Sequence, residues 1–316
     1  MADGREGKGD MQTMERWGII YSPKSGVRHT HRRWEQIRQC LDEFQVEYDF
    51  VQSEARDSEL RLAEMLVKNG YRTLIVVGGD GALNRVLNGI LSLGSDILEE
   101  VRLGVIPNGH GNDFAEFWGF EEDDPRKSVE WLVKGRVRKV DLGVLRCGDR
   151  EHYFLNCVSM GLVATIIDLK RKAYHFWGLS SLSHLTSMFL LLFQRLEKRI
   201  RLLINHERID KKVMTICIGS AHGYGLTPNA VPYNGMLDVS VVSHPAIAQL
   251  VEGMGLLVTG RFLNHRNVKA YRTQQVVTVE EMGRMKVSAD GQVLHGIRAP
   301  FQVSVLQERV NFIIPT

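Results

Sequence analysis

The first third of the chain alternates apolar runs with amphipathic stretches. The apolar runs predict strands, and stretches with an apolar residue at every third or fourth position predict helices. We expect strands at Trp17–Tyr21, Val46–Gln52, Thr73–Val77 and Arg102–Ile106, and helices at Arg32–Phe44, Ser58–Lys68 and Leu83–Leu91. This alternation predicts a parallel sheet with helices on both faces.

The pattern changes near residue 140, where short strand-like runs separated by turn residues begin to dominate. These runs are Val140–Arg146, Tyr153–Val158, Arg201–Ile204, Val213–Ile218, Leu237–Val242, Gln275–Val279, Arg284–Val287, Phe301–Leu306 and Val310–Ile314. Helical stretches at about Val163–Leu196 and Ala246–Phe262 interrupt them. Many short strands with intervening turns predict an antiparallel β-sandwich.

A length of 316 residues predicts about two domains. We expect a disordered tail at residues 1–13, a nucleotide-binding α/β domain at 14–142 and a β-rich sandwich domain for a lipid substrate at 143–316. The sequence leaves open a return of the final strand to the first domain. It also leaves open whether the chain forms a homodimer.

Charge and cysteine content exclude several classes of protein. The formal net charge is only +3, which argues against a nucleic-acid partner because such proteins concentrate basic residues. The irregularly spaced cysteines, Cys40, Cys147, Cys157 and Cys217, predict neither a zinc site nor a disulfide framework. With no apolar core typical of a signal peptide near the start, we expect a cytoplasmic protein.

One apolar segment, Phe176–Phe193, has no Asp, Glu, Lys or Arg, but seven of its 18 residues are Gly, Ser, Thr or His. A spanning helix needs about 20 predominantly apolar residues, so we do not predict a transmembrane segment. Basic residues flank the segment, including Lys170–Lys172 and Lys198–Arg201. This arrangement is typical of peripheral contact with an anionic membrane and equally of a core helix with solvated ends.

Three glycine-rich loops follow predicted strands of the first domain. The first loop is Ser22–Gly26, the second Gly78–Ala82 and the third Pro107–Asp113. In a parallel sheet such loops meet at the carboxyl edge, and glycines let backbone N–H groups approach a phosphate. Asp80 and Asp113 add carboxylates that suit Mg²⁺. The chain has neither GxxxxGK[ST] nor GxGxxG after its first strand, which argues against a P-loop ATPase and a hydride-transfer enzyme.

These loops and several later motifs resemble the diacylglycerol kinase catalytic-domain superfamily, which includes bacterial lipid kinases, sphingosine kinases and ceramide kinases. The resemblance spans residues 16–315 and rests on Ser22–Gly26, Gly78–Asn84, Gly109–Ala115, Asp141–Gly143, Asn156–Gly161 and Ala289–Gln292. It implies an ATP- and Mg²⁺-dependent kinase with two domains. The nucleotide lies between the glycine-rich loops and the β-rich domain, and the substrate is a lipid with a primary hydroxyl.

The resemblance also assigns site residues. Asp80 and Asp290 are the catalytic candidates, and Asp80 and Asp113 the ligands of a catalytic Mg²⁺. Nucleotide-binding positions are Ser25, Gly26, Ser53, Gly78, Gly79, Asp80, Gly81, Ala82, Asn84, Gly109, His110, Gly111, Asn112 and Asp113. A further turn at Asn229–Asp238 resembles a structural metal site, with Val231 and Met236 carbonyls and Asn234 as weak ligands. A plain Asn-Gly turn is the alternative, because an amide binds a hard cation less well than a carboxylate.

The chain departs from the family pattern at three positions. Ala82 and His110 stand where threonines are usual, and Gln292 stands where a glutamate often serves as proton acceptor. That leaves Asp290 or Asp80 as the candidate base, although Asp290-Gly also reads as a hairpin turn. These departures support an alternative, a nucleotide- or lipid-binding homologue with impaired catalysis. An NAD kinase-like soluble-substrate kinase is less favoured, because the chain contains no Asn-Glu dipeptide.

Overall fold

The first domain is an α/β layer built on four parallel strands. The computed structural model describes residues 16–23, 30–54, 58–109, 111–177, 198–243 and 247–315. The strands are β1 (Trp17–Tyr21), β2 (Tyr48–Gln52), β3 (Thr73–Gly78) and β4 (Arg102–Pro107), and the helices are α1 (Thr30–Glu43), α2 (Ser58–Lys68), α3 (Asp80–Leu91), α4 (Ile97–Glu100), α5 (Asp113–Phe117) and α6 (Pro125–Lys134). The strand order β2-β1-β3-β4 brings the carboxyl ends of β1, β3 and β4 to one edge. The predicted α/β fold is confirmed.

Local sequence explains these elements. Every residue of β3 is buried, as its continuous apolar run predicts, and α2 buries Ala63, Leu66 and Val67 along one face. Sequence reasoning missed α6, although its start carries a clear signal. Asp124 caps the helix by accepting a hydrogen bond from the Lys127 N–H, and Pro125 occupies its first turn.

The second domain is a sandwich of two mainly antiparallel layers, as predicted. One layer is a six-stranded sheet in the order β12-β11-β10-β7-β14-β15, and the other continues the sheet of the first domain through β16, β13, β8 and β9. The strands are β5 (Arg136–Cys147), β6 (Arg150–Phe154), β7 (Cys157–Gly161), β8 (Lys198–Ile204), β9 (Glu207–Val213), β10 (Thr215–Gly219), β11 (Leu237–Val242), β12 (Val268–Thr273), β13 (Val277–Glu281), β14 (Val287–Ala289), β15 (Gln292–Leu294) and β16 (Phe301–Ile314). Apolar side chains from both layers form one core between them.

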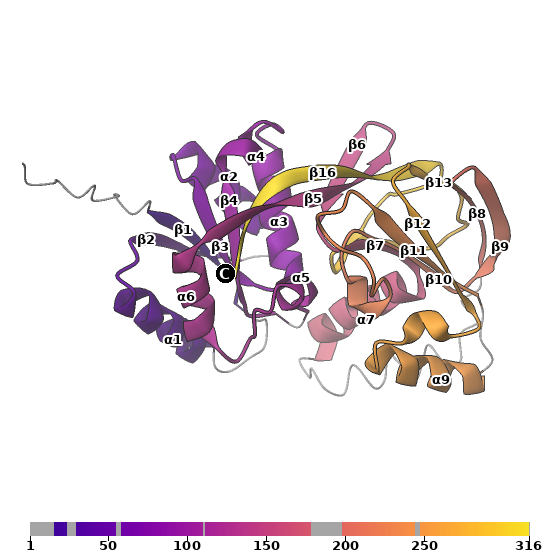
Figure 1. The fold of residues 1–316 in the computed structure, drawn as a ribbon, viewed down its shortest axis with the longest axis horizontal. Coiled ribbons are helices and arrows are strands. Elements are labelled where there is room, and N and C mark those ends of the chain that lie inside the picture. Colours follow the sequence, from indigo (N-terminus) through magenta and orange to yellow (C-terminus); the bar gives the residue numbers. More distant parts are fainter. Residues whose placement is uncertain are drawn as a thin grey trace, which may run out of the picture.

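Two long strands run through both domains. Figure 1 shows β5 and β16 side by side, crossing from the α/β layer into the sandwich. The end of β16 pairs in parallel with β4, through Asn311 and Phe312. The expected boundary at residues 142 and 143 therefore falls inside β5. The two runs predicted at Phe301–Leu306 and Val310–Ile314 form a single strand with an irregularity between them.

Two other runs, each predicted as one strand, each contribute to two strands in the structure. The run Tyr153–Val158 divides into β6 and β7, and Val213–Ile218 divides into β9 and β10. Each break contains an apolar residue, Leu155 in the first and Met214 in the second, so the pattern alone does not show where a strand leaves its partner. The first break exposes the backbone N–H groups of Leu155 and Asn156 to a carboxylate of the site described below.

Helices α7 (Leu162–Trp177) and α9 (Ile247–Val258) and the short helix η2 (Phe262–Asn264) lie beside the six-stranded sheet (Figure 1). A small core that includes Cys157, Cys217 and Phe262 lies on this side of the sheet. The part of the predicted helical stretch from residue 178 to 196 lies outside the described residues. Within the described chain, no helix is long and apolar enough to cross a membrane.

Candidate active site

The second and third glycine-rich loops pack backbone against backbone. A Cβ added at Gly79 would lie 2.5 Å from the carbonyl oxygen of Gly111, and one at Gly109 would lie 2.3 Å from the Cα of Gly79. Backbone atoms cannot retreat as a flexible side chain does, so neither position accepts a larger residue. The two loops therefore form one continuous surface at the carboxyl edge of the sheet.

Asp80 joins these loops through its carboxylate. Its Oδ2 accepts a hydrogen bond from the Asp113 N–H at 2.9 Å, and its Oδ1 accepts one from the Phe114 N–H at 3.1 Å. Its own N–H donates to the Gly111 carbonyl at 3.0 Å. The carboxylate thus supplies acceptors for N–H groups in the first turn of α5, which lack partners within that helix.

The electrostatics of Asp80 are unusual. Its pKa is raised to about 7, chiefly by burial and then by the neighbouring Asp113 carboxylate, against the lowering effect of the Phe114 N–H. Burial also raises the pKa of Glu116, with a contribution from Asp113. Negative charge therefore accumulates where the two loops meet.

This arrangement suits a hard divalent cation. Two carboxylates that repel each other are stabilised by a positive ion between them. The described residues contain no group of three or more Asp, Glu, His or Cys placed to hold a metal. Mg²⁺ typically takes one or two carboxylates and completes its shell with water and phosphate oxygens, so Asp80 and Asp113 fit that donor set.

Other predicted nucleotide contacts are placed in different ways. Asn112 closes the third loop, since its Oδ1 accepts from the Gly109 N–H at 3.0 Å and its amide donates to the Gly109 carbonyl at 3.2 Å. The Ala82 side chain is buried, and a Cβ at Gly78 would approach it to 2.8 Å. Ser25, Gly26 and His110 lie outside the described residues.

The Ser53 hydroxyl is already engaged within the protein. It donates to Oε1 of Glu59 at 3.2 Å, and the Ser22 hydroxyl donates to the same atom at 2.7 Å. Arg85 holds both oxygens of this carboxylate, at 2.8 and 3.0 Å. The pKa of Glu59 is lowered, because these partners outweigh the effect of burial.

Sequence reasoning missed Glu59 and Arg85. Glu59 lies in the first turn of α2, four residues before Ala63 on the same buried face. A charged residue on an apolar helix face was the available signal, because a buried carboxylate requires a partner. Arg85 is that partner, and the pair links α2 to α3 beside the second loop.

Asp290 lies at the turn between β14 and β15 and is fully surrounded by donors. Its Oδ1 accepts from the N–H groups of Asn156 and Cys157, at 3.0 and 2.9 Å. Its Oδ2 accepts from the Leu155 N–H at 2.7 Å and from the Asn84 amide at 3.0 Å. Burial raises its pKa to about 6, while these donors act in the opposite direction. With a φ of 42° and four donors in place, Asp290 joins β14–β15 to the break between β6 and β7.

Asn84 extends this junction into the first domain. Its amide nitrogen also donates to the Tyr153 carbonyl at 2.8 Å, and the Asn88 amide donates to the same oxygen at 3.0 Å. Gln292 completes the contact, since its amide nitrogen donates to the Gly81 carbonyl at 2.7 Å. The predicted residues Asp80, Asn84 and Asp290 thus lie in a connected region where the two domains meet.

Groups predicted to hold a second metal accept hydrogen bonds within their own turn. The Asn234 side-chain oxygen accepts from the Met236 N–H at 2.9 Å, and the Val231 carbonyl accepts from the Tyr233 N–H at 2.8 Å. Asp141 binds the Gly235 N–H at 2.7 Å. Hydrogen bonds within the turn therefore engage two of the three groups that the prediction assigned to a cation, Asn234 and the Val231 carbonyl.

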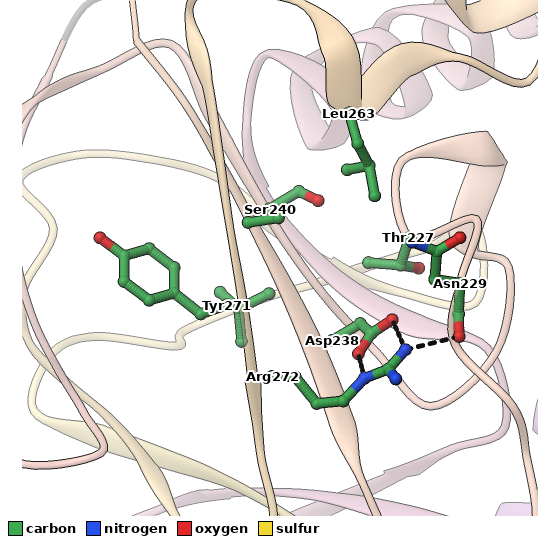
Figure 2. Close-up of a pocket in the computed structure, with 9 residues that line it drawn as sticks. Thr227, Asn229, Asp238, Ser240, Leu263, Tyr271 and Arg272 are labelled. Carbon is green, nitrogen blue, oxygen red and sulfur yellow. Dashed lines mark hydrogen bonds and ion pairs between the residues drawn. The ribbon is translucent and has the colours of Figure 1, made fainter.

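A separate cavity of about 460 Å³ lies over β11 and β12. Figure 2 shows the Arg272 guanidinium paired with the Asp238 carboxylate, at 2.6 and 2.9 Å, and bonded to the Asn229 carbonyl. Tyr271 points away from these groups (Figure 2). Because Arg272 and Asp238 neutralise each other, this ion pair offers a phosphate no net positive charge in the cavity.

Comparisons with known proteins identify the family and the fold. The family model for the diacylglycerol kinase catalytic domain matches residues 16–145, and that for the YegS C-terminal NAD kinase beta sandwich-like domain matches residues 157–314. The chain is 22% identical to a diacylglycerol kinase of Bacillus subtilis (strain 168) over 96% of this chain and 97% of the relative. It is 24% identical to a diacylglycerol kinase of Staphylococcus carnosus (strain TM300) over 94% of each.

A crystal structure of a putative diacylglycerol kinase from Bacillus anthracis str. Sterne has the same fold. It aligns with a TM-score of 0.73 at 18% identity and covers 95% of this chain and 97% of that one. Both halves of the chain match in sequence, and the arrangement of the two domains matches in structure. The chain belongs to the diacylglycerol kinase catalytic-domain superfamily.

Proposed function

We propose that this protein is an ATP- and Mg²⁺-dependent lipid kinase that phosphorylates the primary hydroxyl of a diacylglycerol or a sphingoid-type lipid. One observation carries the proposal: the Asp80 carboxylate joins the second and third loops beside Asp113, where two domains meet. Family membership implies a kinase that takes ATP as its phosphate donor. The name diacylglycerol kinase, which these relatives carry, supports a lipid substrate.

The geometry suggests how the chain supports phosphoryl transfer. The lipid hydroxyl oxygen bonds to the γ-phosphorus as the bond to the β-phosphate oxygen breaks, so that ADP leaves. This reaction depends mainly on positioning and on stabilising negative charge. The tightly packed second and third loops would keep the backbone close to the phosphates, and Asp80 and Asp113 would hold the cation. When bound, Mg²⁺ neutralises charge on the transferred group.

The proton of the lipid hydroxyl needs an acceptor, and Asp80 is the better of the two candidates. Asp80 is 7% exposed, and each of its carboxylate oxygens accepts a single hydrogen bond, which leaves each oxygen a further lone pair. Asp290 is 2% exposed and already accepts four hydrogen bonds. We therefore assign Asp290 a structural role at the domain junction.

Membrane contact is a further part of the proposal. An acylated substrate requires the protein to reach a lipid surface, and the basic residues around the segment from 176 to 193 motivated that expectation. Two of them in the described chain, Arg199 and Arg201, form ion pairs with Asp210, which reduces the charge they offer to lipid. Sedimentation with anionic and neutral vesicles tests this part separately.

The decisive experiment combines turnover with binding. Purified protein is incubated with labelled ATP, Mg²⁺ and a panel of diacylglycerol, sphingoid base and NAD. We expect label in one lipid and none in NAD, and Asp80→Asn should abolish the activity while Asp149→Asn, an exposed turn position, should not. Labelling of NAD, or of no acceptor, would overturn the proposal.

A catalytically impaired homologue is the second candidate function. Ala82 carries no hydroxyl, and Gln292 has no ionisable group. Calorimetric titration with ATP on the same sample separates the two functions. ATP binding without turnover of any lipid in the panel would favour the impaired homologue.

A further inference from the structure

Gln292 connects the two domains at the second loop. It is the first residue of β15, in the hairpin of the six-stranded sheet, whereas Gly81 belongs to the first turn of α3. The Gln292 amide nitrogen donates to the Gly81 carbonyl at 2.7 Å and reaches the side-chain oxygen of Asn84 at 3.3 Å. A strand of the substrate domain is thus held directly on the loop assigned to phosphate.

Both atoms that Gln292 contacts are hydrogen-bond acceptors. The Gly81 carbonyl is one by nature. The orientation of the Asn84 amide is set by its nitrogen, which donates to the Tyr153 carbonyl and to Asp290, so its oxygen faces Gln292. The side chain at position 292 must therefore provide an N–H donor.

A carboxylate at this position would reverse the interaction. An ionised glutamate has only acceptor oxygens, and the oxygen that takes the place of Nε2 would face both the Gly81 and the Asn84 oxygens and repel them. Asp290 on the same hairpin is itself acidic, so it offers no positive charge to compensate an added carboxylate. The glutamine is thus matched to its surroundings as an amide.

We propose that Gln292 is a positioning residue that holds the substrate domain on the second loop through its amide N–H, and that turnover depends on this donor. The inference rests on the proposed lipid kinase function. It assigns position 292 a role different from proton acceptance. Since the contact spans both domains, its loss should disturb the alignment of the two substrates more than the affinity for either one.

The test compares three variants with the wild type. Gln292→Met keeps the length of the side chain without a donor, Gln292→Glu supplies acceptors only, and Gln302→Glu makes the same chemical change at an exposed position of β16. We expect kcat to fall about tenfold in Gln292→Met, as for the loss of a partly buried hydrogen bond. It should fall further in Gln292→Glu, while Gln302→Glu retains wild-type turnover.

Nucleotide affinity separates positioning from general damage. The Kd for ATP, measured by calorimetry, should stay within about threefold of the wild type in both Gln292 variants. A Gln292→Glu variant as fast as the wild type or faster would overturn the inference, since it would show that a base is useful there. A Gln292→Met variant with wild-type kcat would overturn it as well.

A separate measurement applies if the wild type proves to have no lipid kinase activity. Hydrogen exchange then reports on the contact itself, because freeing the hairpin from α3 should increase exchange at residues 81–84 and 287–294 in Gln292→Met. Unchanged exchange in both segments overturns the positioning role. Increased exchange without kinase activity supports the contact and refutes only the proposed function.

Discussion

Replacing Asp290 by asparagine separates a structural carboxylate from a catalytic one. Each oxygen of Asp290 accepts two hydrogen bonds, those to Oδ1 from Asn156 and Cys157 and those to Oδ2 from Leu155 and Asn84. Asparagine turns one of these oxygens into an NH₂ group. Whichever way the amide is oriented, two N–H donors lose their acceptor and face another donor.

The cost of this change follows from burial. Asp290 is 2% exposed, so water cannot replace the lost acceptor, and each orphaned buried donor costs about 1–3 kcal/mol. We expect Asp290→Asn to lower the free energy of unfolding by about 2–6 kcal/mol, a large part of the stability of a typical protein. At any pH above the pKa of about 6 the wild-type carboxyl is ionised, so the comparison is made there.

Urea unfolding followed by tryptophan fluorescence measures this change, with Asp149→Asn as the control at an exposed turn. Kinase activity is measured on the same samples below the unfolding transition. A structural junction predicts a large loss of stability with turnover reduced only in part. Unchanged stability combined with a loss of turnover of about 10³-fold or more would refute the reasoning and restore Asp290 as the base.

Three further predictions concern other parts of the site. If ionised Asp80 holds Mg²⁺, kcat/KM falls as the pH is lowered through about 7. More Mg²⁺ moves the midpoint of the pH profile to lower pH, because a cation favours the ionised form. A midpoint independent of the Mg²⁺ concentration contradicts this prediction. Arg85→Met leaves Glu59 buried without its guanidinium and lowers the free energy of unfolding by about 3–5 kcal/mol in urea titrations. Adding Glu59→Gln should recover part of the loss, so strict additivity of the two changes argues against the pairing. In Gly79→Ala the new methyl would lie 2.5 Å from the Gly111 carbonyl oxygen of the third loop, so calorimetry should show that ATP binding is lost. Gly255→Ala, with open space around its Cβ, should bind ATP as the wild type does. Equal binding by both variants would show that the loops tolerate separation.

Much of the fold could be predicted because its signals are local. A continuous apolar run followed by glycine predicts both β3 and the second loop, and the helical spacing of Ser58–Lys68 coincides with α2. Parallel strands place the loops at their carboxyl ends at one edge, so the contact between the second and third loops follows from topology. The residue types at this edge are therefore recognisable from the sequence alone.

Other features depend on contacts between distant parts of the chain. The apolar pattern does not show the break between β6 and β7. Leu155 and Asn156 leave the ladder there because their N–H groups bind a carboxylate that lies 135 and 134 residues away. The turn at Asn234 resembles a metal site, but the Asn234 side-chain oxygen and the Val231 carbonyl accept hydrogen bonds from the Met236 and Tyr233 N–H groups. Such pairings depend on which strands become neighbours, which no local pattern records.

The sequence by itself determined the family, the α/β and sandwich layers, and the edge where Asp80 lies, since hydrophobic periodicity and glycine loops are encoded within short windows. Only the tertiary structure decided what the individual polar groups do. It engages the Ser53 hydroxyl with Glu59, surrounds Asp290 with donors and turns Gln292 toward Gly81. The physical reason is that a buried polar group takes its role from its hydrogen-bond partners, and these partners lie up to 211 residues away along the chain.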